Sequence, residues 1–174
     1  MEKLKRLAGH LGAGAMNWHA LRLYRLSSRL FAAGHPTTGM IVAAVNRVLT
    51  GVEIHPQARF GPGLIIMHGT GIVVHPGTRV GSDCVIYQGV TLGSRAHDGK
   101  PPTLGDRVTM FPGAKVLGDI VIGDDVRIGP NAVVIASLPA GATALAPLAV
   151  ARNAQDSDGE DPRGDSGAAG SVGA

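Results

Sequence analysis

Residues 54–92 read IHPQARFGPGLIIMHGTGIVVHPGTRVGSDCVIYQGVTL, and residues 104–138 read LGDRVTMFPGAKVLGDIVIGDDVRIGPNAVVIASL. An apolar residue returns there at every sixth position, in three phased blocks. This lead register consists of Ile54, Phe60, Ile66, Val74, Val80, Ile86, Leu92, Leu104, Met110, Val116, Ile122, Ile128 and Val134. A second register, four residues after each lead residue, is mostly small or apolar: Ala58, Leu64, Thr78, Cys84, Val90, Val108, Ala114, Ile120, Val126, Ala132 and Leu138.

A period of six residues fits neither an amphipathic helix, which repeats about every 3.6 residues, nor the two-residue alternation of a simple strand. It fits a parallel β-helix, in which each hexapeptide forms one short strand and a turn, and three hexapeptides complete one triangular coil. The lead residue then points inward, and the residue four positions later fills the corner. Glycine often follows the lead residue, where a turn leaves no room for a side chain.

Four motifs resemble the hexapeptide acyltransferases and, among them, the serine acetyltransferase family. They are residues 51–56 (GVEIHP), 68–74 (HGTGIVV), 87–93 (YQGVTLG) and 113–118 (GAKVLG), and the resemblance covers about residues 50–152. The resemblance implies a left-handed parallel β-helix, a homotrimer with active sites between subunits, and a cytoplasmic enzyme of cysteine biosynthesis. It also implies transfer of an acetyl group from acetyl-CoA to the hydroxyl of a small acceptor, with no metal.

His68 is the predicted catalytic base. The resemblance places the family's catalytic histidine there, and the six-residue phase slips at the same point, because Ile66 and Val74 are eight positions apart. A repeat that breaks its own rule is expected at a functional site. An alcohol is a weak nucleophile, and an imidazole close to it can take its proton. The resemblance pairs this histidine with a carboxylate, which is Glu53 here and would orient the ring.

The resemblance also implies binding residues. For CoA these are Gly93, Ser94, Pro112, Arg127 and Pro130, and for the acceptor they are Met67, Arg95, His97 and Lys100. The hexapeptide pattern fails between Leu92 and Leu104, where residues 94–102 are rich in Gly, Pro and charge, so we predict a loop that leaves the coil and closes over a ligand.

Three departures from the family bear on the acceptor. Met67 stands where an aspartate precedes the histidine, Lys100-Pro101 stands where an Arg-His pair grips a carboxylate, and residues 75–78 (HPGT) replace a Gly-Glu-Thr run. L-Serine remains the default acceptor, and a sugar or secondary-metabolite hydroxyl is the alternative. Two more distant alternatives are a metalloenzyme like the γ-type carbonic anhydrases, with zinc on His55, His68, His75 and His97, and an inactive trimeric scaffold.

The chain of 174 residues divides into four predicted parts: a helical segment (1–50), the β-helix (51–138), a capping segment (139–152) and a disordered tail (153–174). In the first part, helices are predicted from Trp18 to Ala33 and from Met40 to Leu49, the second capped by Thr37 or Thr38 and closed near Gly51. Its excess of basic residues is read as a solvated helix face, with no nucleic acid or membrane as partner. A single cysteine, Cys84, and the lack of a long apolar run favour the cytoplasm.

Overall fold

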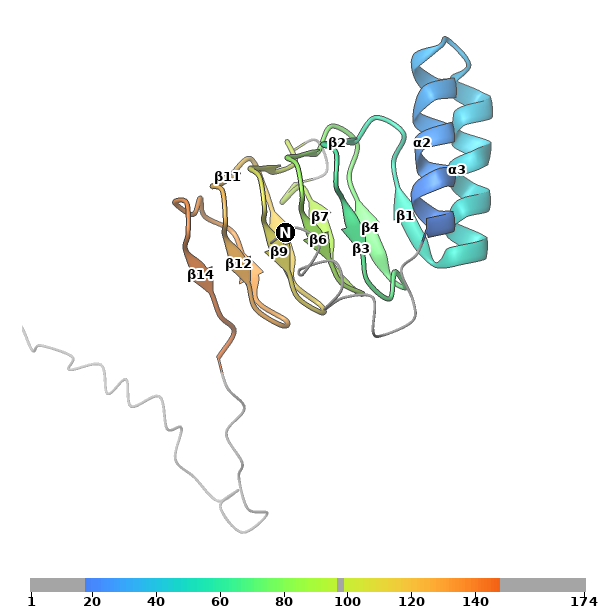
Figure 1. Cartoon of the computed structure of the whole chain (residues 1–174). Coiled ribbons are helices and arrows are strands. Elements are labelled where there is room, and N and C mark those ends of the chain that lie inside the picture. Colours follow the sequence, from blue (N-terminus) through green and yellow to red (C-terminus); the bar gives the residue numbers. More distant parts are fainter. Residues whose placement is uncertain (1–17, 97–98, 148–174) are drawn as a thin grey trace, which may run out of the picture.

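The computed structural model describes residues 18–96 and 99–147, which form two helices followed by a parallel β-helix (Figure 1). Three parallel sheets make up the three sides of the coil. The first sheet contains β1 (Val52–Ile54), β4 (Ile72–Val74), β7 (Thr91–Gly93), β10 (Lys115–Leu117) and β13 (Val133–Val134). The second contains β2 (Arg59–Phe60), β5 (Arg79–Val80), β8 (Thr103–Leu104) and β11 (Val121–Ile122). The third contains β3 (Ile65–Ile66), β6 (Val85–Ile86), β9 (Thr109–Met110), β12 (Arg127–Ile128) and β14 (Thr143–Ala144).

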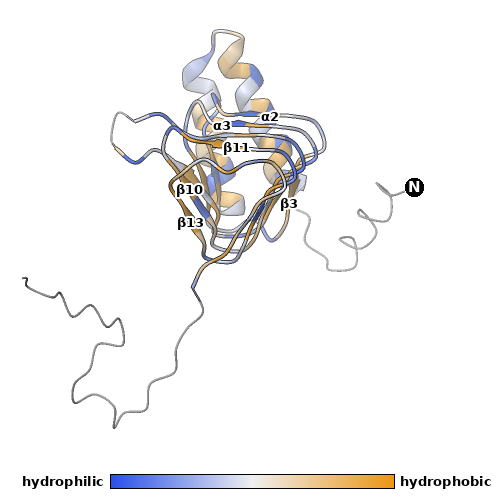
Figure 2. Ribbon diagram, turned by 90° about the vertical axis from the view of Figure 1, so that its left-hand side faces the viewer, coloured by the Kyte–Doolittle hydropathy of each residue, from blue (hydrophilic) through white to orange (hydrophobic). Residues whose placement is uncertain are grey.

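The lead register predicted from the sequence forms the interior. Each of its residues is at most 6% exposed, except Phe60, which is partly buried. Strand pairing stacks them in columns, such as Ile66, Ile86, Met110 and Ile128 in the third sheet. Viewed along its axis, the coil has a triangular outline with hydrophobic strands on its sides (Figure 2). The predicted left-handed parallel β-helix of hexapeptide repeats is confirmed.

The second register lies at the corners, as expected. Ala58, Thr78, Cys84 and Ala114 are fully buried there. Turns at the corners use left-handed backbone conformations, and residues other than glycine also adopt them: His68, Asp83, Arg107, Asp125 and Asn131 have φ between 55° and 59°. Asparagine and aspartate tolerate this region better than most residues because their side chains bond locally.

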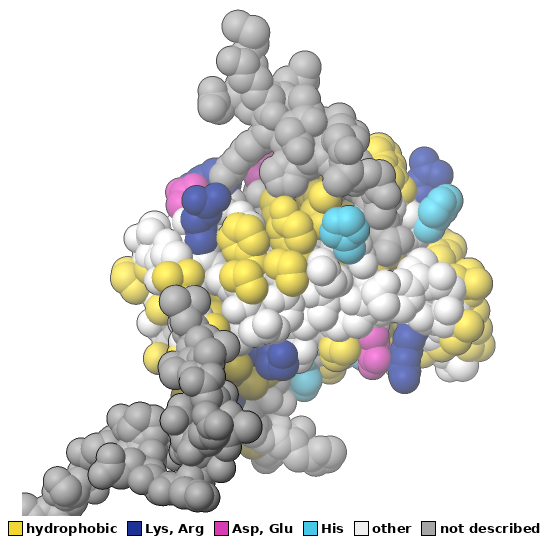
Figure 3. All heavy atoms as spheres, turned by 90° about the horizontal axis from the view of Figure 1, so that it is seen from below, with side chains coloured by type: hydrophobic (Ala, Val, Ile, Leu, Met, Phe, Trp, Pro, Cys, Tyr) yellow, Lys and Arg dark blue, Asp and Glu magenta, His cyan; other side chains and the backbone are white. Residues whose placement is uncertain are grey.

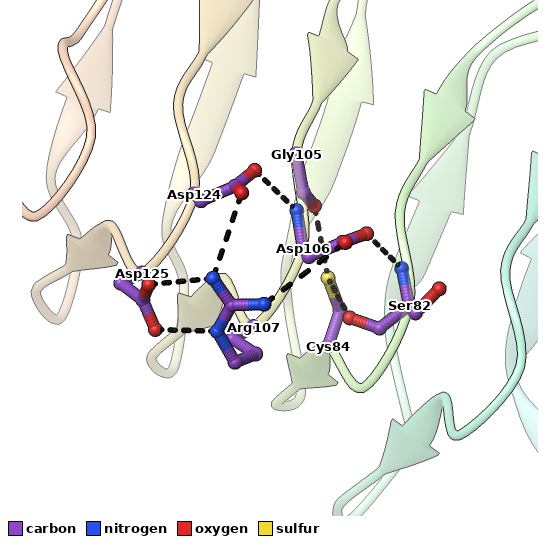
Figure 4. A network of polar contacts seen from close by, with 7 residues as sticks. All are labelled: Ser82, Cys84, Gly105, Asp106, Arg107, Asp124 and Asp125. Carbon is purple, nitrogen blue, oxygen red and sulfur yellow. Dashed lines mark hydrogen bonds and ion pairs between the residues drawn. The ribbon is translucent and has the colours of Figure 1, made fainter.

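Side chains fasten the corner between the second and third sheets (Figure 4). Asp106 Oδ1 accepts a hydrogen bond from the Ser82 backbone N–H at 2.7 Å, and Asp124 Oδ1 accepts one from the Asp106 N–H at 2.9 Å. Arg107 donates to both carboxylate oxygens of Asp125 at 2.8 and 2.7 Å. These contacts tie three successive coils together by side chains as well as by the sheets.

Helices α2 (Trp18–Ala32) and α3 (Pro36–Thr50) lie side by side at the first coil (Figure 1). A Cβ on Gly39 would meet the Ser27 carbonyl oxygen at 2.8 Å, so the helices cross with almost no space between them. Helix α3 starts earlier than predicted, because Pro36 opens its first turn, and neither Thr37 nor Thr38 caps it. The predicted end is confirmed, since Gly51 caps the helix in the left-handed conformation.

Tyr24 joins the helices to the coil. Its hydroxyl donates to the Ala58 carbonyl oxygen at 2.6 Å, and its ring meets that of Phe60 edge to face. At the other end of the coil, the segment predicted as a cap adds β14 to the third sheet, where Thr143 pairs with Arg127. Residues 148–174, including the predicted tail, lie outside the described residues. Neither of the two described helices is long and apolar enough to cross a membrane.

Candidate active site

His68 lies at the corner where the chain passes from the third sheet to the first. Met67 and Tyr87 occupy equivalent positions, because the Met67 N–H bonds to Ile86 O and the Tyr87 N–H to Met110 O. On the far side of the corner, Gly71 and Gly89 stack, each donating to the preceding coil. The first of these two corners therefore has two extra residues, His68 and Gly69. The slip in the six-residue repeat of the sequence therefore corresponds to a two-residue insertion in this turn.

The His68 side chain is exposed, with φ 57° and with the backbone N–H of Thr70 bonded to its carbonyl oxygen. Within residues 18–96 and 99–147, no hydrogen bond or ion pair engages its imidazole. Figure 3 views this side of the coil, where hydrophobic side chains gather in the middle of the surface. An imidazole that has no partner and stands at the surface is free to take a proton from a bound ligand.

Glu53 lies on the outer face of the first sheet, beside Val73 in the next coil. Its Oε2 is 3.4 Å from Nη1 of Arg47 on helix α3, and both side chains are at least half exposed. In the single chain, the carboxylate predicted to orient His68 is thus paired with a helix arginine. Sequence spacing gave no sign of this pair, because it depends on how α3 meets the coil.

The residues predicted to bind CoA fall into two groups. Pro112 and Pro130 lie at the same corner as His68, and Arg127 is exposed on the adjoining third sheet in register with Thr109. Gly93 and Ser94 lie across the first sheet, at the corner between the first and second sheets. The chain does not bring the two groups together, because the width of a sheet separates them.

The loop after Gly93 carries the residues predicted to bind the acceptor. Lys100 Nζ is 3.4 Å from Asp119 Oδ2, and both side chains are exposed. Arg95 is exposed, and its aliphatic chain covers Gly118, where an added Cβ would meet Arg95 Cδ at 2.9 Å. Both cationic side chains therefore contact the turn at residues 118–119 of the next coil. His97, another predicted contact, lies outside the described residues.

Met67 is only 4% exposed and packs under the histidine turn. In the resembled family an aspartate stands at this position. The apolar thioether of Met67 cannot pair with an ammonium group as a carboxylate would.

The histidines of the alternative zinc site lie at different corners. His55 and His75 share the corner between the first and second sheets, and His68 lies at the corner between the third and the first. Burial, with a smaller contribution from the charge of His75, lowers the pKa of His55. The described residues contain no group of three or more His, Cys, Asp or Glu side chains arranged around a metal.

Three neighbours of the histidine turn were missed as site residues. Tyr87 and Phe111 stack with ring centroids 5.6 Å apart and an interplanar angle of 12°. Gln88, between Tyr87 and Gly89, has a buried side-chain oxygen that finds no hydrogen-bond partner among the described residues. Tyr87 and Gln88 stand in one of the four motifs, so the signal was present. Their place beside His68 follows only from the stacking of the coils.

Known proteins match this chain in sequence and in structure. A family model described as bacterial transferase hexapeptide (six repeats) matches residues 101–136. A serine acetyltransferase of Helicobacter pylori is 47% identical over 129 residues, which cover 73% of this chain and 75% of that protein. The structure of the Neisseria gonorrhoeae serine acetyltransferase in complex with serine matches with a TM-score of 0.69 and 35% identity over 72% of this chain. A serine acetyltransferase in complex with CoA gives 0.68 and 36%, also over 72% of this chain.

The coil and these matches place the chain among the hexapeptide-repeat acyltransferases. Within that class, it belongs to the serine acetyltransferase family. The chain spans about half the length of the two solved structures, 52% in each case.

Proposed function

We propose that the chain is an acetyl-CoA-dependent O-acetyltransferase in which His68 is the general base. The observation that carries the proposal is the unpartnered imidazole on the two-residue extension of the turn between β3 and β4. Family membership supports acetyl-CoA as the donor, because one matching serine acetyltransferase has been solved with CoA.

The proposed reaction is a direct transfer. His68 takes the proton of the acceptor hydroxyl as its oxygen attacks the thioester carbonyl. When the tetrahedral intermediate collapses, the carbon–sulfur bond breaks, the acetyl group stays on the acceptor oxygen, and the proton passes to the departing CoA sulfur. Cys84 takes no part, because it is buried in the corner register.

L-Serine is the first candidate acceptor, since a matching enzyme has been solved with serine. A sugar or secondary-metabolite hydroxyl is the second candidate, and two observations favour it. The apolar Met67 lies under the histidine turn, and the Lys100 ammonium is already paired with Asp119. A zwitterionic acceptor needs an anion for its ammonium and a cation for its carboxylate.

The test is a thiol-release assay with acetyl-CoA and a panel of L-serine, homoserine, amino sugars and neutral sugars. We expect release with one acceptor class, and a fall in kcat of at least about 100-fold in His68→Ala. His35→Ala is the matched control, because His35 is an exposed histidine before helix α3. Near-normal turnover in His68→Ala, or no thiol release with any member of the panel, would contradict the proposal. A homotrimeric assembly and a cytoplasmic location also remain proposals.

A further inference from the structure

Gln88 lies on the same corner as His68, one coil further along. The corner residues Thr70, Gln88, Pro112 and Pro130 succeed each other from coil to coil, and we call them the corner ridge. Hydrogen bonds fix their order: the Gly89 N–H donates to Thr70 O at 3.0 Å, the Gly113 N–H to Gln88 O at 2.9 Å, and the Asn131 N–H to Pro112 O at 2.9 Å. A ligand that reaches His68 along this corner meets Gln88 next.

The corner ridge offers few hydrogen-bonding groups. Pro112 and Pro130 have no backbone N–H, and the N–H of Thr70 is taken by His68 O. The carbonyl oxygens of Thr70, Gln88 and Pro112 already accept bonds from the next coil. The ridge keeps the Thr70 hydroxyl, the Pro130 carbonyl oxygen, and the backbone N–H and carboxamide of Gln88 for a polar ligand. Of these, the carboxamide alone carries both a donor and an acceptor on one planar group.

The carboxamide of Gln88 also lacks a hydrogen-bond donor for its oxygen among the described residues. Its Oε1 is buried, and no hydrogen-bond donor reaches it from the described residues. A buried oxygen without a donor lowers stability. The Gln88 residue as a whole is only half-buried, so rotation of its terminal amide can bring the oxygen to a ligand that supplies a donor. Beside it, the stacked rings of Tyr87 and Phe111 provide an apolar wall.

We propose that the Gln88 carboxamide binds an amide of the pantetheine arm of the acyl-CoA donor. The arm is a thin chain with two secondary amides, and each amide has the N–H donor and C=O acceptor that a carboxamide matches. In the proposed reaction the thioester lies beside His68, and the predicted CoA contacts Pro112 and Pro130 lie further along the corner ridge. An arm that joins these places passes Gln88, which lies between them. The inference rests on the proposed function. It goes further by naming the Gln88 side chain as the group on the corner ridge that hydrogen-bonds to the donor.

The experiment measures binding by calorimetry, without any acceptor. Two probes are used: CoA, and adenosine 3′,5′-bisphosphate, which lacks the pantetheine arm. In Gln88→Met, which keeps the length of the side chain and removes its amide, we expect CoA affinity to fall about 2- to 12-fold. Affinity for the bisphosphate stays unchanged. Gln57→Met is the matched control, because Gln57 is an exposed glutamine at a different corner of the first coil.

Each result has a distinct meaning. Unchanged CoA affinity in Gln88→Met overturns this inference and leaves the proposed function intact, and so does an equal loss with both probes. If the unaltered chain does not bind CoA, the proposed function itself fails. Should Gln88→Met not fold, NMR on the unaltered chain decides: the side-chain amide signals of Gln88 shift with CoA and not with the bisphosphate. No shift with CoA would overturn the assignment.

Discussion

At the residue scale, the carboxylate of Glu53 and the imidazole of His68 differ in their local contacts. Glu53 faces outward from β1 and pairs with Arg47, whereas no described side chain bonds to the imidazole of His68 on its extended turn. Exposed ion pairs contribute little to stability, typically about 0–1 kcal/mol. The Arg47 pair therefore does not prevent Glu53 from turning to the imidazole when a ligand binds.

We expect Glu53→Gln to lower kcat by roughly 10- to 100-fold, because a neutral amide stabilises the imidazolium less than a carboxylate does. Arg47→Ala breaks the same ion pair from its other side and should leave kcat nearly unchanged. The check is steady-state kinetics on both variants. Equal losses in the two variants would show that the ion pair itself, and not orientation of His68, is what Glu53 provides.

Cys84 is expected to be unreactive in the folded chain. Burial raises the pKa of its thiol from 9.0 to about 11, and its sulfur donates toward Gly105 O at 3.4 Å. A thiol reagent at pH 8 should label it only after denaturation, as followed by absorbance or mass. Rapid labelling of the folded chain would contradict the buried placement.

The same shift has a consequence for stability at high pH. Above pH 9 the unfolded chain loses the thiol proton while the folded chain retains it, so this group lowers the free energy of unfolding as pH rises toward 11. Cys84→Ala, which matches the alanines of the same register, should show a weaker decline over that range in denaturant unfolding. Parallel curves for the two proteins would refute this.

At the scale of elements, Tyr24 is the link between the helices and the first coil. We expect Tyr24→Phe to lower the free energy of unfolding by about 1–2 kcal/mol, because the Ala58 carbonyl loses its 2.6 Å hydrogen bond in a buried setting. Tyr87→Phe is the matched control, since no hydrogen bond engages the Tyr87 hydroxyl within the described residues. Denaturant unfolding measures both, and equal effects would deny Tyr24 this role.

The coil was predictable from the sequence because its interior depends on one local rule. A period of six residues decides which side chain faces inward, and Ile54, Ile122 and Ile128 obey it although they belong to three different sheets. The histidine turn was predictable for the converse reason, because it breaks that rule. The start of helix α3 was placed less well, since Pro36 is its first residue and the predicted helix began only at Met40.

The surroundings of the site could not be predicted in the same way. The pairing of Glu53 with Arg47 depends on the angle at which α3 meets the coil. The pairing of Lys100 with Asp119 depends on where the loop folds back. The partnerless Gln88 oxygen depends on the stacking of successive coils. None of these contacts joins residues at a spacing that the repeat determines.

At the scale of the whole molecule, the predicted site residues that lie in turns gather at two of the three corners of the β-helix. His68, Pro112 and Pro130 lie at the corner between the third and first sheets, and Ser94, Arg95 and Lys100 follow the corner between the first and second. The strands of the first sheet that separate them have up to three residues, or roughly 10 Å at about 3.3 Å per residue. A small acceptor cannot span that width, so we expect the loop of one subunit to meet His68 of another.

Mixing two inactive variants tests this arrangement. One carries His68→Ala, and the other carries Arg95→Ala with Lys100→Ala in the loop. If each site takes its histidine and its loop from different subunits, equal amounts unfolded and refolded together give random assemblies in which about a quarter of the sites are intact at both corners. We therefore expect about a quarter of the unaltered activity in thiol release, although neither variant alone is active. If both corners serve the site of their own subunit, every site keeps one defect and the mixture stays inactive. A mixture no more active than its parents, with mixed assemblies shown by mass, would therefore place each site within one subunit and exclude the intersubunit arrangement.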